Sequence, residues 1–342
     1  MTSSSLTLVT GSAGHLGEAL VRTLRAAGRD ARGLDVLPSP YTDVVGSITD
    51  PAVVERAMDG VRDVVHAATL HKPHVATHSR QQFIDTNITG TLNLLEAAAR
   101  AGVRCFLYTS TTSAFGDALT PPEGAPAAWI TEDVIPVPKN IYGVTKVAAE
   151  DLCALAHRNQ GLACLVIRTS RFFPEADDDP AACAAYPDAN LKANEFLYRR
   201  LDVEDVVGAH LCALDRAPAL GFGRYIVSAT TPFRPEDAEA LRRDAPAVLS
   251  RRAPGWEPIY AQLGWRMAPS LDRVYDNAHA RAQLGWQPRH DFAAVIARAR
   301  DTGDIRSPLA RAIGAKGYHS DGSFCPHGPA GPTGSTGGAQ DA

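Results

Sequence analysis

The sequence predicts an α/β fold in which a doubly wound parallel sheet is followed by a smaller C-terminal lobe. Two observations carry this prediction. Short apolar segments alternate with amphipathic helical segments as far as about residue 170, which is the pattern of repeated β-α-β units. The first apolar segment, Leu6–Val9, leads directly into a glycine-rich turn, and apolar residues at helical spacing follow that turn.

The glycine-rich turn is the strongest local signal. Gly11, Gly14 and Gly17 follow the strand, and the free backbone N–H groups at the start of the next helix can bind a phosphate. Gly11 permits the tight turn, Gly14 lets the backbone approach a diphosphate, and Gly17 lets the helix pack on the sheet. The spacing GxxGxxG departs from GxGxxG, and a turn merely rich in small residues would look similar. The flanking strand and helix favour a dinucleotide-binding Rossmann fold.

An acidic residue stands at the distance that this fold requires. Asp35 lies near the end of the second apolar segment, Ala31–Leu37. A carboxylate there accepts hydrogen bonds from the adenosine ribose and repels a 2′-phosphate, so it favours NAD over NADP. The alternative is an ordinary turn residue at a strand end, and Arg29 and Arg32 lie close in sequence.

The remainder of the first half continues the alternation and gives a nucleotide-binding domain over 1–170. Asp50 and Pro51 predict a capped helix. A strand over 63–69 then ends in the small residues Ala67, Ala68 and Thr69, which leave room for a flat cofactor ring. The later predicted elements are a helix over 83–101, a strand over 105–110, a helix around 142–152 and a strand over 164–168.

The second half is less regular and predicts a substrate-binding lobe over 171–314, with the sheet completed by segments near 198–230. A short strand near 199–201 leads into a helix capped by Glu204 or Asp205. The acidic run Asp177–Asp179 is typical of a solvated turn. The tail 315–342 has few large apolar residues, so we expect it to be disordered.

Composition excludes several functional classes. The formal net charge of −4 gives no reason to expect a nucleic acid or an acidic membrane as a partner. Six cysteines without a CxxC pair, together with the absence of a long apolar run, indicate a cytoplasmic protein with reduced thiols. His71, His74 and His78 have no cysteine or acidic cluster beside them, so we predict a polar loop near the active site and no metal.

Two residues four apart on a predicted helix suggest the chemistry. Tyr142 and Lys146 project from one face of that helix. A phenol with a pKa near 10 needs a shift of about 3 units, or about 4 kcal/mol, to act as a base near pH 7. A neighbouring ammonium and a positive nicotinamide both favour the phenolate. Thr111, at the end of the preceding strand, offers a hydroxyl to a substrate oxygen. The alternative is a solvated helix face, which the glycine-rich turn and the Thr/Ser-rich strand end disfavour.

Taken together, these segments resemble the extended short-chain dehydrogenase/reductase family, in its NAD-dependent epimerase/dehydratase branch. The resemblance covers the chain from Leu6 to about Phe292. It rests on the segments 11–17, 66–69, 109–116, 142–146, 202–206 and 284–288, together with Asp35 and Asn87.

The resemblance implies a role for each matching position. Tyr142 would transfer the proton, Lys146 would hold the nicotinamide ribose, and Thr111 takes the place of the family's catalytic Ser/Thr. The implied cofactor is NAD, and the implied assembly is a homodimer. The implied cofactor-binding residues are Gly11, Ala13, Gly14, His15, Leu16, Gly17, Asp35, Ser47, Ile48, Ala67, Ala68, Thr69, Asn87, Thr109, Tyr142 and Lys146. The implied substrate residues are Thr111, Thr112, Arg171 and Arg199.

The resemblance implies an NAD-dependent epimerase of a sugar or nucleotide-sugar, in which a hydride is transferred to NAD and returned. The same residues serve an NAD(P)-dependent dehydrogenase or reductase of a non-sugar substrate, so this alternative stays open. A catalytically silent NAD-binding regulator is disfavoured because Tyr142 and Lys146 are both present. Thr112 and Ser113 replace the Asp-Glu pair of sugar dehydratases, and Arg171 stands where sugar epimerases usually have asparagine.

Overall fold

The computed structural model of the chain describes residues 6–177 and 179–317. Its main feature is a seven-stranded sheet with the order β3-β2-β1-β4-β5-β7-β8, in which all neighbouring strands run parallel. The predicted doubly wound α/β sheet is confirmed. The strands are β1 (Thr7–Thr10), β2 (Ala31–Asp35), β3 (Val44–Val45), β4 (Asp63–His66), β5 (Cys105–Thr111), β7 (Cys164–Thr169) and β8 (Phe222–Val227).

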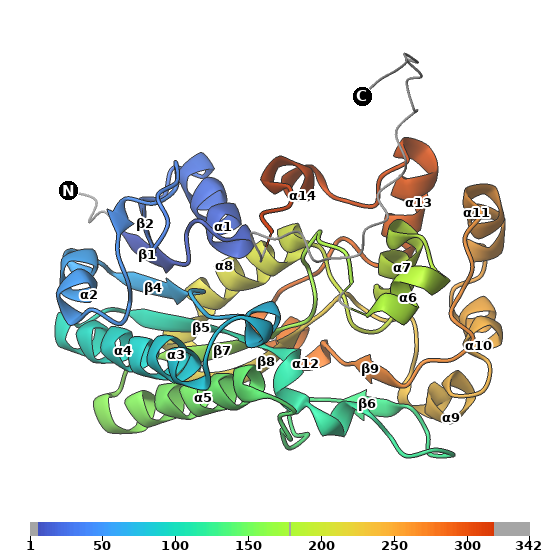
Figure 1. The fold of residues 1–342 in the computed structure, drawn as a ribbon, viewed down its shortest axis with the longest axis horizontal. Coiled ribbons are helices and arrows are strands. Elements are labelled where there is room, and N and C mark those ends of the chain that lie inside the picture. The colour runs from blue at the N-terminus through green and yellow to red at the C-terminus, as the bar shows by residue number, and fades with distance from the viewer. Residues whose placement is uncertain (1–5, 178, 318–342) are drawn as a thin grey trace, which may run out of the picture.

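Helices cover both faces of this sheet. Figure 1 shows it between α1 and α8 on one side and α4 and α5 on the other. Alternate strand residues point to opposite faces, so each strand supplies both cores. One core joins α2, α4 and α5 to Leu8, Val64, Phe106 and Val166; the other joins α1 and α8 to Val9, Val65, Leu107 and Ile167. The helices of this part are α1 (His15–Ala26), α2 (Pro51–Met58), α3 (Arg80–Ile84), α4 (Gly90–Ala101), α5 (Ile141–Gln160) and α8 (Val203–Leu220).

A smaller set of elements lies at the right of Figure 1, beside the carboxyl ends of the strands. A second sheet there pairs β6 (Ala128–Ile130) in parallel with β9 (Arg273–Tyr275). The helices of this part are α6 (Pro180–Ala185), α7 (Asp188–Glu195), α9 (Ala238–Leu241), α10 (Ala245–Arg252), α11 (Trp256–Leu263) and α13 (Phe292–Thr302). Two further helices lie nearer the centre: α12 (Ala278–Leu284) packs against β8 and α8, and α14 (Pro308–Ile313) against α1 and α8. Short 3-10 turns occupy Lys72–Ala76, Thr112–Phe115, Asp117–Leu119 and Pro235–Asp237.

Three local predictions are corrected. Helix α8 begins two or three residues earlier than expected, because Asp202, and not Glu204 or Asp205, is its cap and accepts a hydrogen bond from the Glu204 amide at 2.8 Å. The expected strand near 199–201 is a single bridge between Arg171 and Arg200. The predicted helix over 83–101 is a continuous helical run that includes a π turn at Asp85–Thr89, between α3 and α4.

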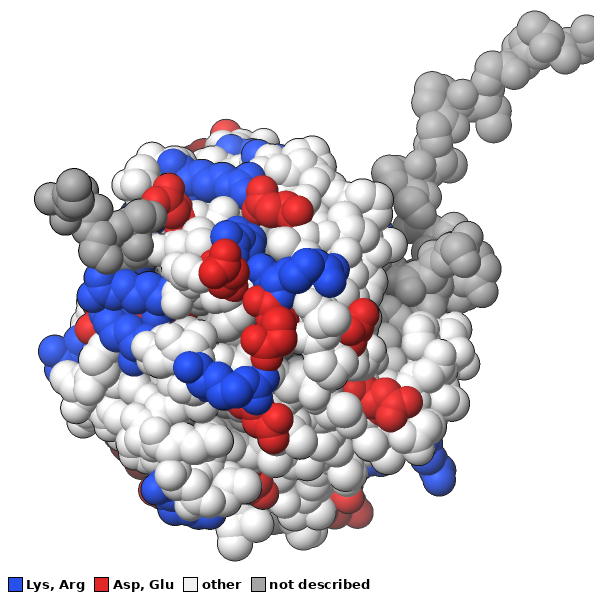
Figure 2. All heavy atoms as spheres, turned by 90° about the vertical axis from the view of Figure 1, so that its left-hand side faces the viewer, with Lys and Arg blue, Asp and Glu red and all other residues white. Residues whose placement is uncertain are grey.

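The surface and the cysteines match an ordinary globular chain. The five cysteines among the described residues are free, and Cys325 lies outside the described residues. No helix in the described ranges is both long and apolar enough to cross a membrane. On the face shown in Figure 2, acidic and basic side chains are interspersed, so the charge on this face is mixed.

Candidate active site

A cleft of about 1040 Å³ lies where the sheet order reverses, at the carboxyl ends of β1, β4 and β5. This is the position at which doubly wound folds bind ligands. It brings together the predicted residues of the glycine-rich turn, the ribose site, the catalytic group and the substrate site. Those lining it are Gly11, Ala13, Gly14, His15, Leu16, Gly17, Asp35, Ser47, Ile48, Ala67, Ala68, Thr69, Thr109, Thr111, Thr112, Tyr142, Lys146, Arg171 and Arg199.

The glycine-rich turn is closed on one side and open on the other. A Cβ atom at Gly11 would lie 2.8 Å from the Ala68 nitrogen, and one at Gly17 would lie 1.9 Å from the Gly11 oxygen. Gly11 also has a φ of +72°, which L side chains rarely adopt. A Cβ at Gly14 would meet only the Gly11 oxygen, at 3.2 Å, so the backbone here is accessible from the cleft. These residues therefore fit a dinucleotide diphosphate at the N-terminus of α1.

The ribose end of the cleft is formed by Asp35, at the end of β2. Its carboxylate accepts hydrogen bonds from the Ala13 amide at 3.0 Å and the Leu37 amide at 2.9 Å. A carboxylate has further acceptor sites for ribose hydroxyls. The nearby Arg32 guanidinium donates instead to the carbonyls of Ala57 and Asp59 at the end of α2. This arrangement fits NAD better than a cofactor with a 2′-phosphate.

The predicted catalytic residues lie in the first turns of α5 and at the end of β5. Asn140 caps α5 by accepting a hydrogen bond from the Gly143 amide at 3.0 Å. Tyr142 and Lys146 are then one turn apart, and both are buried. The Lys146 ammonium donates to the Thr109 carbonyl at 2.6 Å and lies 4.2 Å from the centre of the Tyr108 ring.

Burial controls the protonation of this pair. Burial raises the pKa of Tyr142 to about 12, although a hydrogen bond with Thr111 lowers it. Burial also lowers the pKa of Lys146 to about 7, against the opposing charge of Glu150. The downward shift that the sequence suggested for the phenol is thus outweighed by desolvation. Proton removal from Tyr142 near neutral pH requires positive charge beyond that of the side chains, and an oxidised nicotinamide carries such a charge.

Asn87 is the one predicted cofactor residue that does not line the cleft. It lies in the π turn, and its carboxamide oxygen accepts from the Leu70 amide at 2.8 Å and the Thr69 hydroxyl at 3.0 Å. Its amide nitrogen donates to Thr145 of α5 at 3.0 Å. Asn87 therefore ties the chain after β4 to the helix that carries Tyr142. π turns are common at functional sites.

The substrate end of the cleft contains an arginine cluster, which we define as Arg171, Arg199 and Arg200. All three guanidinium groups surround the fully buried Glu195. Arg199 and Arg200 lie 2.6 Å from its carboxylate, and Arg171 lies 3.3 Å from it. Burial opposes the ionised form of Glu195, but the guanidinium charges outweigh this effect and lower its pKa to about 2.

Asp177 also belongs to this network, which corrects the predicted solvated turn. It is buried, pairs with Arg171 and lies 3.8 Å from Arg199. Three guanidinium groups against two carboxylates leave one positive charge. Arg273 of β9 lines the same cleft, but its charge is paired with Asp272 at 3.6 Å. The cleft can therefore hold an anionic group at this cluster.

His71 belongs to the polar loop predicted near the active site, whereas Glu175 and the segment 315–317 were not predicted to line the cleft. His71 lies 4.5 Å from the Phe173 ring and 5.4 Å from the Tyr142 ring, measured between ring centres. Burial lowers its pKa to about 3, so it is neutral at neutral pH. Among the residues that the structure describes, no group of three or more His, Cys, Asp or Glu could hold a metal ion. Glu175 and the segment 315–317 also line the cleft. The sequence around Glu175 and 315–317 contains no motif that would predict this location, because both lie in the irregular second half of the chain.

Comparison with known proteins agrees with this geometry. Residues 7–227 match the model of the NAD dependent epimerase/dehydratase family. A 3 beta-hydroxysteroid dehydrogenase/Delta 5-->4-isomerase of Mycobacterium tuberculosis is 33% identical over 327 residues, which cover 82% of this chain and 85% of that protein.

Two crystal structures with NAD share the fold. A short-chain dehydrogenase/reductase superfamily protein from Agrobacterium tumefaciens has a TM-score of 0.63 and 26% identity, and the match covers 90% of this chain and 97% of that one. The UDP-glucose 4-epimerase of Thermus thermophilus has a TM-score of 0.58 and 25% identity, with 86% and 98% covered.

Proposed function

Because the chain belongs to the NAD-dependent epimerase/dehydratase family and is an NAD-dependent enzyme, we propose that it is an epimerase of a sugar or nucleotide-sugar that carries an anionic group. One observation carries this proposal. Tyr142, Lys146 and Thr111 lie in a single cleft between a glycine-rich turn that fits a diphosphate and an arginine cluster with excess positive charge.

The proposed mechanism assigns the proton chemistry to three side chains. Thr111 and Tyr142 hold the oxygen of the reacting hydroxyl group, and Tyr142 removes its proton. Lys146 would hold the nicotinamide ribose and add positive charge near the phenol. NAD, when bound, would accept the hydride and give it back. Once the oxidised sugar has presented its other face, Tyr142 would return the proton to the same oxygen. No net oxidation results.

The arginine cluster would select the substrate by charge. A guanidinium group matches a carboxylate or phosphate in geometry and remains charged at all relevant pH values. Glu195 and Asp177 hold the three arginines in place, and the remaining positive charge is available to the anion. This supports a sugar acid or a nucleotide-sugar over a neutral sugar.

The first experiment is to purify the protein without added cofactor, denature it and identify the released nucleotide by mass spectrometry. We expect close to one NAD per chain. The protein is then incubated with anionic sugars and nucleotide-sugars, and products are followed by NMR. Interconversion of two epimers without accumulation of NADH supports the proposal. An empty site, with NADH accumulating only when NAD is added, would reject it.

A net dehydrogenase of a non-sugar alcohol is the second candidate. The similarity to the Mycobacterium tuberculosis hydroxysteroid dehydrogenase favours it, as does the aromatic wall of His71, Phe172 and Phe173 in the cleft. A panel of secondary alcohols with added NAD, read by NADH absorbance, tests this candidate directly.

We also propose a homodimer formed through α4 and α5. Leu92 on α4 and Val144 and Leu155 on α5 are 38%, 48% and 42% exposed, respectively. Val144 and Leu155 are eleven residues apart, about three turns, so they share one face of α5. Leu155→Glu should convert a dimer to a monomer in analytical ultracentrifugation. Ile135→Glu, at an exposed loop position, is the control. A wild-type monomer would refute the proposal.

A further inference from the structure

The last three residues that the structure describes lie against the cofactor cleft. Helix α14 ends at Ile313, and Ala315, Lys316 and Gly317 then line the cleft together with His15 and Gly17. The segment 315–317 lies beyond the predicted substrate lobe, at the beginning of the predicted disordered tail. The segment lies next to the N-terminus of α1, where we expect the diphosphate to bind.

One carboxylate holds the backbone of this segment. Glu175 accepts hydrogen bonds from the Lys316 amide at 2.9 Å and the Gly317 amide at 3.2 Å. The same oxygen lies 2.8 Å from Nε2 of His15. Burial opposes the ionised form of Glu175, but the bonds from His15 and from the Lys316 amide outweigh it and lower its pKa to about 2. Glu175 is therefore a charged acceptor that joins the segment to the first residue of α1.

A second carboxylate holds the side chain of Lys316. Its ammonium donates to Glu18 at 2.5 Å, and Glu18 is buried in the first turn of α1. Arg22 pairs with the other oxygen of Glu18 at 2.7 Å. The carboxylates of Glu175 and Glu18 are thus balanced by the charges of Lys316 and Arg22. The net charge around the segment is close to zero, so it does not repel a diphosphate. The contacts of Glu175 with the backbone and of Glu18 with the Lys316 side chain together hold the segment at the start of α1.

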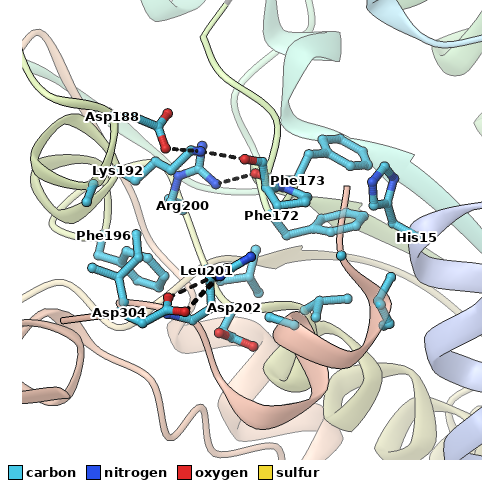
Figure 3. A pocket seen from close by; sticks show the side chains of 18 of the residues that line it. His15, Phe172, Phe173, Asp188, Lys192, Phe196, Arg200, Leu201, Asp202 and Asp304 are labelled. Carbon is cyan, nitrogen blue, oxygen red and sulfur yellow. Dashed lines mark hydrogen bonds and ion pairs between the residues drawn. The ribbon is translucent and has the colours of Figure 1, made fainter. Parts of the chain in front are cut away.

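Gly314, which directly precedes the segment, is a position at which the backbone can turn. Gly314 has a φ of +65°, and nothing lies within 4 Å of where its Cβ would be. A second cavity of about 290 Å³ lies against Ile313 and Gly314. Figure 3 shows this cavity with Phe172 and Phe173 on one side and Lys192 and Phe196 on the other. Ile313 is packed in the core, whereas Gly314 has no neighbour at its Cβ position and borders the cavity, so the backbone can pivot at Gly314.

We propose that residues 315–317 form a strap across the diphosphate part of the cofactor site, held shut by Glu175 and Glu18, and that NAD enters and leaves only when these contacts open. The proposal rests on the NAD site of the proposed function and extends it. A closed strap would retain the cofactor between turnovers, which an epimerase that returns its hydride requires.

The test is the exchange of bound cofactor, measured without any substrate. The full-length protein is loaded with fluorescent etheno-NAD and mixed rapidly with excess NAD, and the association rate is measured separately. The variants are Glu175→Gln and Lys316→Ala, each checked for an unchanged melting curve. Lys139→Ala is the matched control, because Lys139 lines the same cleft but pairs with Asp117 at the substrate end.

We expect both strap variants to raise the dissociation rate and the association rate at least tenfold, while the control stays within twofold of the wild type. A strap blocks movement in both directions, so the dissociation constant should change less than either rate. Rates within twofold of the wild type in both variants would overturn the proposal. A faster dissociation with an unchanged association rate would also overturn it, because that result describes a direct contact without a barrier. Either failure leaves the proposed proton-transfer role of Tyr142 intact.

Discussion

At the residue scale, burial shifts the pKa values of Tyr142 and Lys146, the proposed catalytic pair. It moves the pKa of Tyr142 to about 12 and that of Lys146 to about 7, so it favours the uncharged form of both groups. The Thr109 carbonyl and the Tyr108 ring partly compensate the ammonium. The phenol of Tyr142 is thus protonated at neutral pH and can give up its proton only when a further positive charge lies nearby.

Tyr142→Phe removes the hydroxyl group that would carry the proton. We expect kcat on the identified substrate to fall by about 10²- to 10⁴-fold, the usual contribution of general acid–base catalysis. The amount of bound NAD should not change, because the ring remains. Tyr186→Phe is the control, since Tyr186 lies after α6 and contacts Arg266. Unchanged turnover in Tyr142→Phe would rule out the proposed role.

Lys146→Met tests the lowered lysine pKa through stability. The unfolded chain holds this proton up to a pH of about 10.5, whereas the folded protein releases it near pH 7. Between these values the unfolded state binds more protons, so the free energy of unfolding rises with pH, by at most about 1.4 kcal/mol per pH unit. Urea denaturation between pH 7 and 9 should show a flatter dependence for the variant. Equal slopes would contradict the shift.

At the element scale, Asp202 links two helices. It caps α8 through the Glu204 amide, and its carboxylate also accepts from the Ser307 hydroxyl at 2.6 Å and the Ser307 amide at 3.0 Å. Ser307 in turn caps α14, the helix that leads to the strap. One side chain therefore sets the start of both helices.

Asp202→Ala leaves three donors without this acceptor in a buried place. We expect the free energy of unfolding to fall by about 2–4 kcal/mol. Asp291→Ala is the matched control, because Asp291 caps α13 through the Ala294 amide at 2.9 Å and should cost about 1 kcal/mol. Urea denaturation measures both. If the two variants lose equal stability, the link between α8 and α14 contributes nothing.

At the scale of the whole molecule, buried neutral histidines join the layers. His66 of β4 bonds Thr10 of β1 at 2.7 Å and Thr91 of α4 at 2.9 Å. His210 of α8 bonds Thr109 of β5 at 3.0 Å. Burial lowers the pKa of His66 to about 3, with a smaller effect from Lys146, and that of His210 to about 4.

These shifts predict acid sensitivity. The unfolded chain takes up histidine protons near pH 6.5, which the folded protein binds only near pH 3–4. The unfolded state is therefore favoured as the pH falls from 6.5 to 4, by up to about 1.4 kcal/mol per pH unit for each histidine. Urea denaturation at pH 6.5, 5.5 and 4.5 should show this loss. His210→Gln should reduce the dependence of the unfolding free energy on pH by the contribution of one histidine. An unchanged pH dependence would refute the lowered pKa of His210.

The sequence predicted those parts of the molecule that local pattern determines. The glycine-rich turn, Asp35 and Tyr142 each follow a strand or open a helix, so their neighbours in sequence fix their positions. Asp177 could not be placed in this way, because its partners Arg171 and Arg199 meet it only through the folding of an irregular segment.

Two other features also lay beyond local pattern. Lys316 pairs with Glu18 across 298 positions of the chain, which no local pattern reveals. Three neighbouring acids could all have capped α8, and only the extended backbone at Asp202, with a ψ of 146°, selects one of them. Local chemistry thus specified the nucleotide half of the site, whereas chain topology specified the substrate half.

The small sheet of β6 and β9 has a consequence for synthesis on the ribosome. Ile130 ends β6, and Arg273 begins its partner β9, so 143 residues separate the two edges (273 − 130). At about 5–20 residues per second, translation leaves β6 without its partner for roughly 7–29 s. The first five strands of the large sheet are complete much earlier. Nascent chains therefore pass through a period in which the nucleotide half is formed and an apolar strand edge is exposed, when chaperones would be most needed.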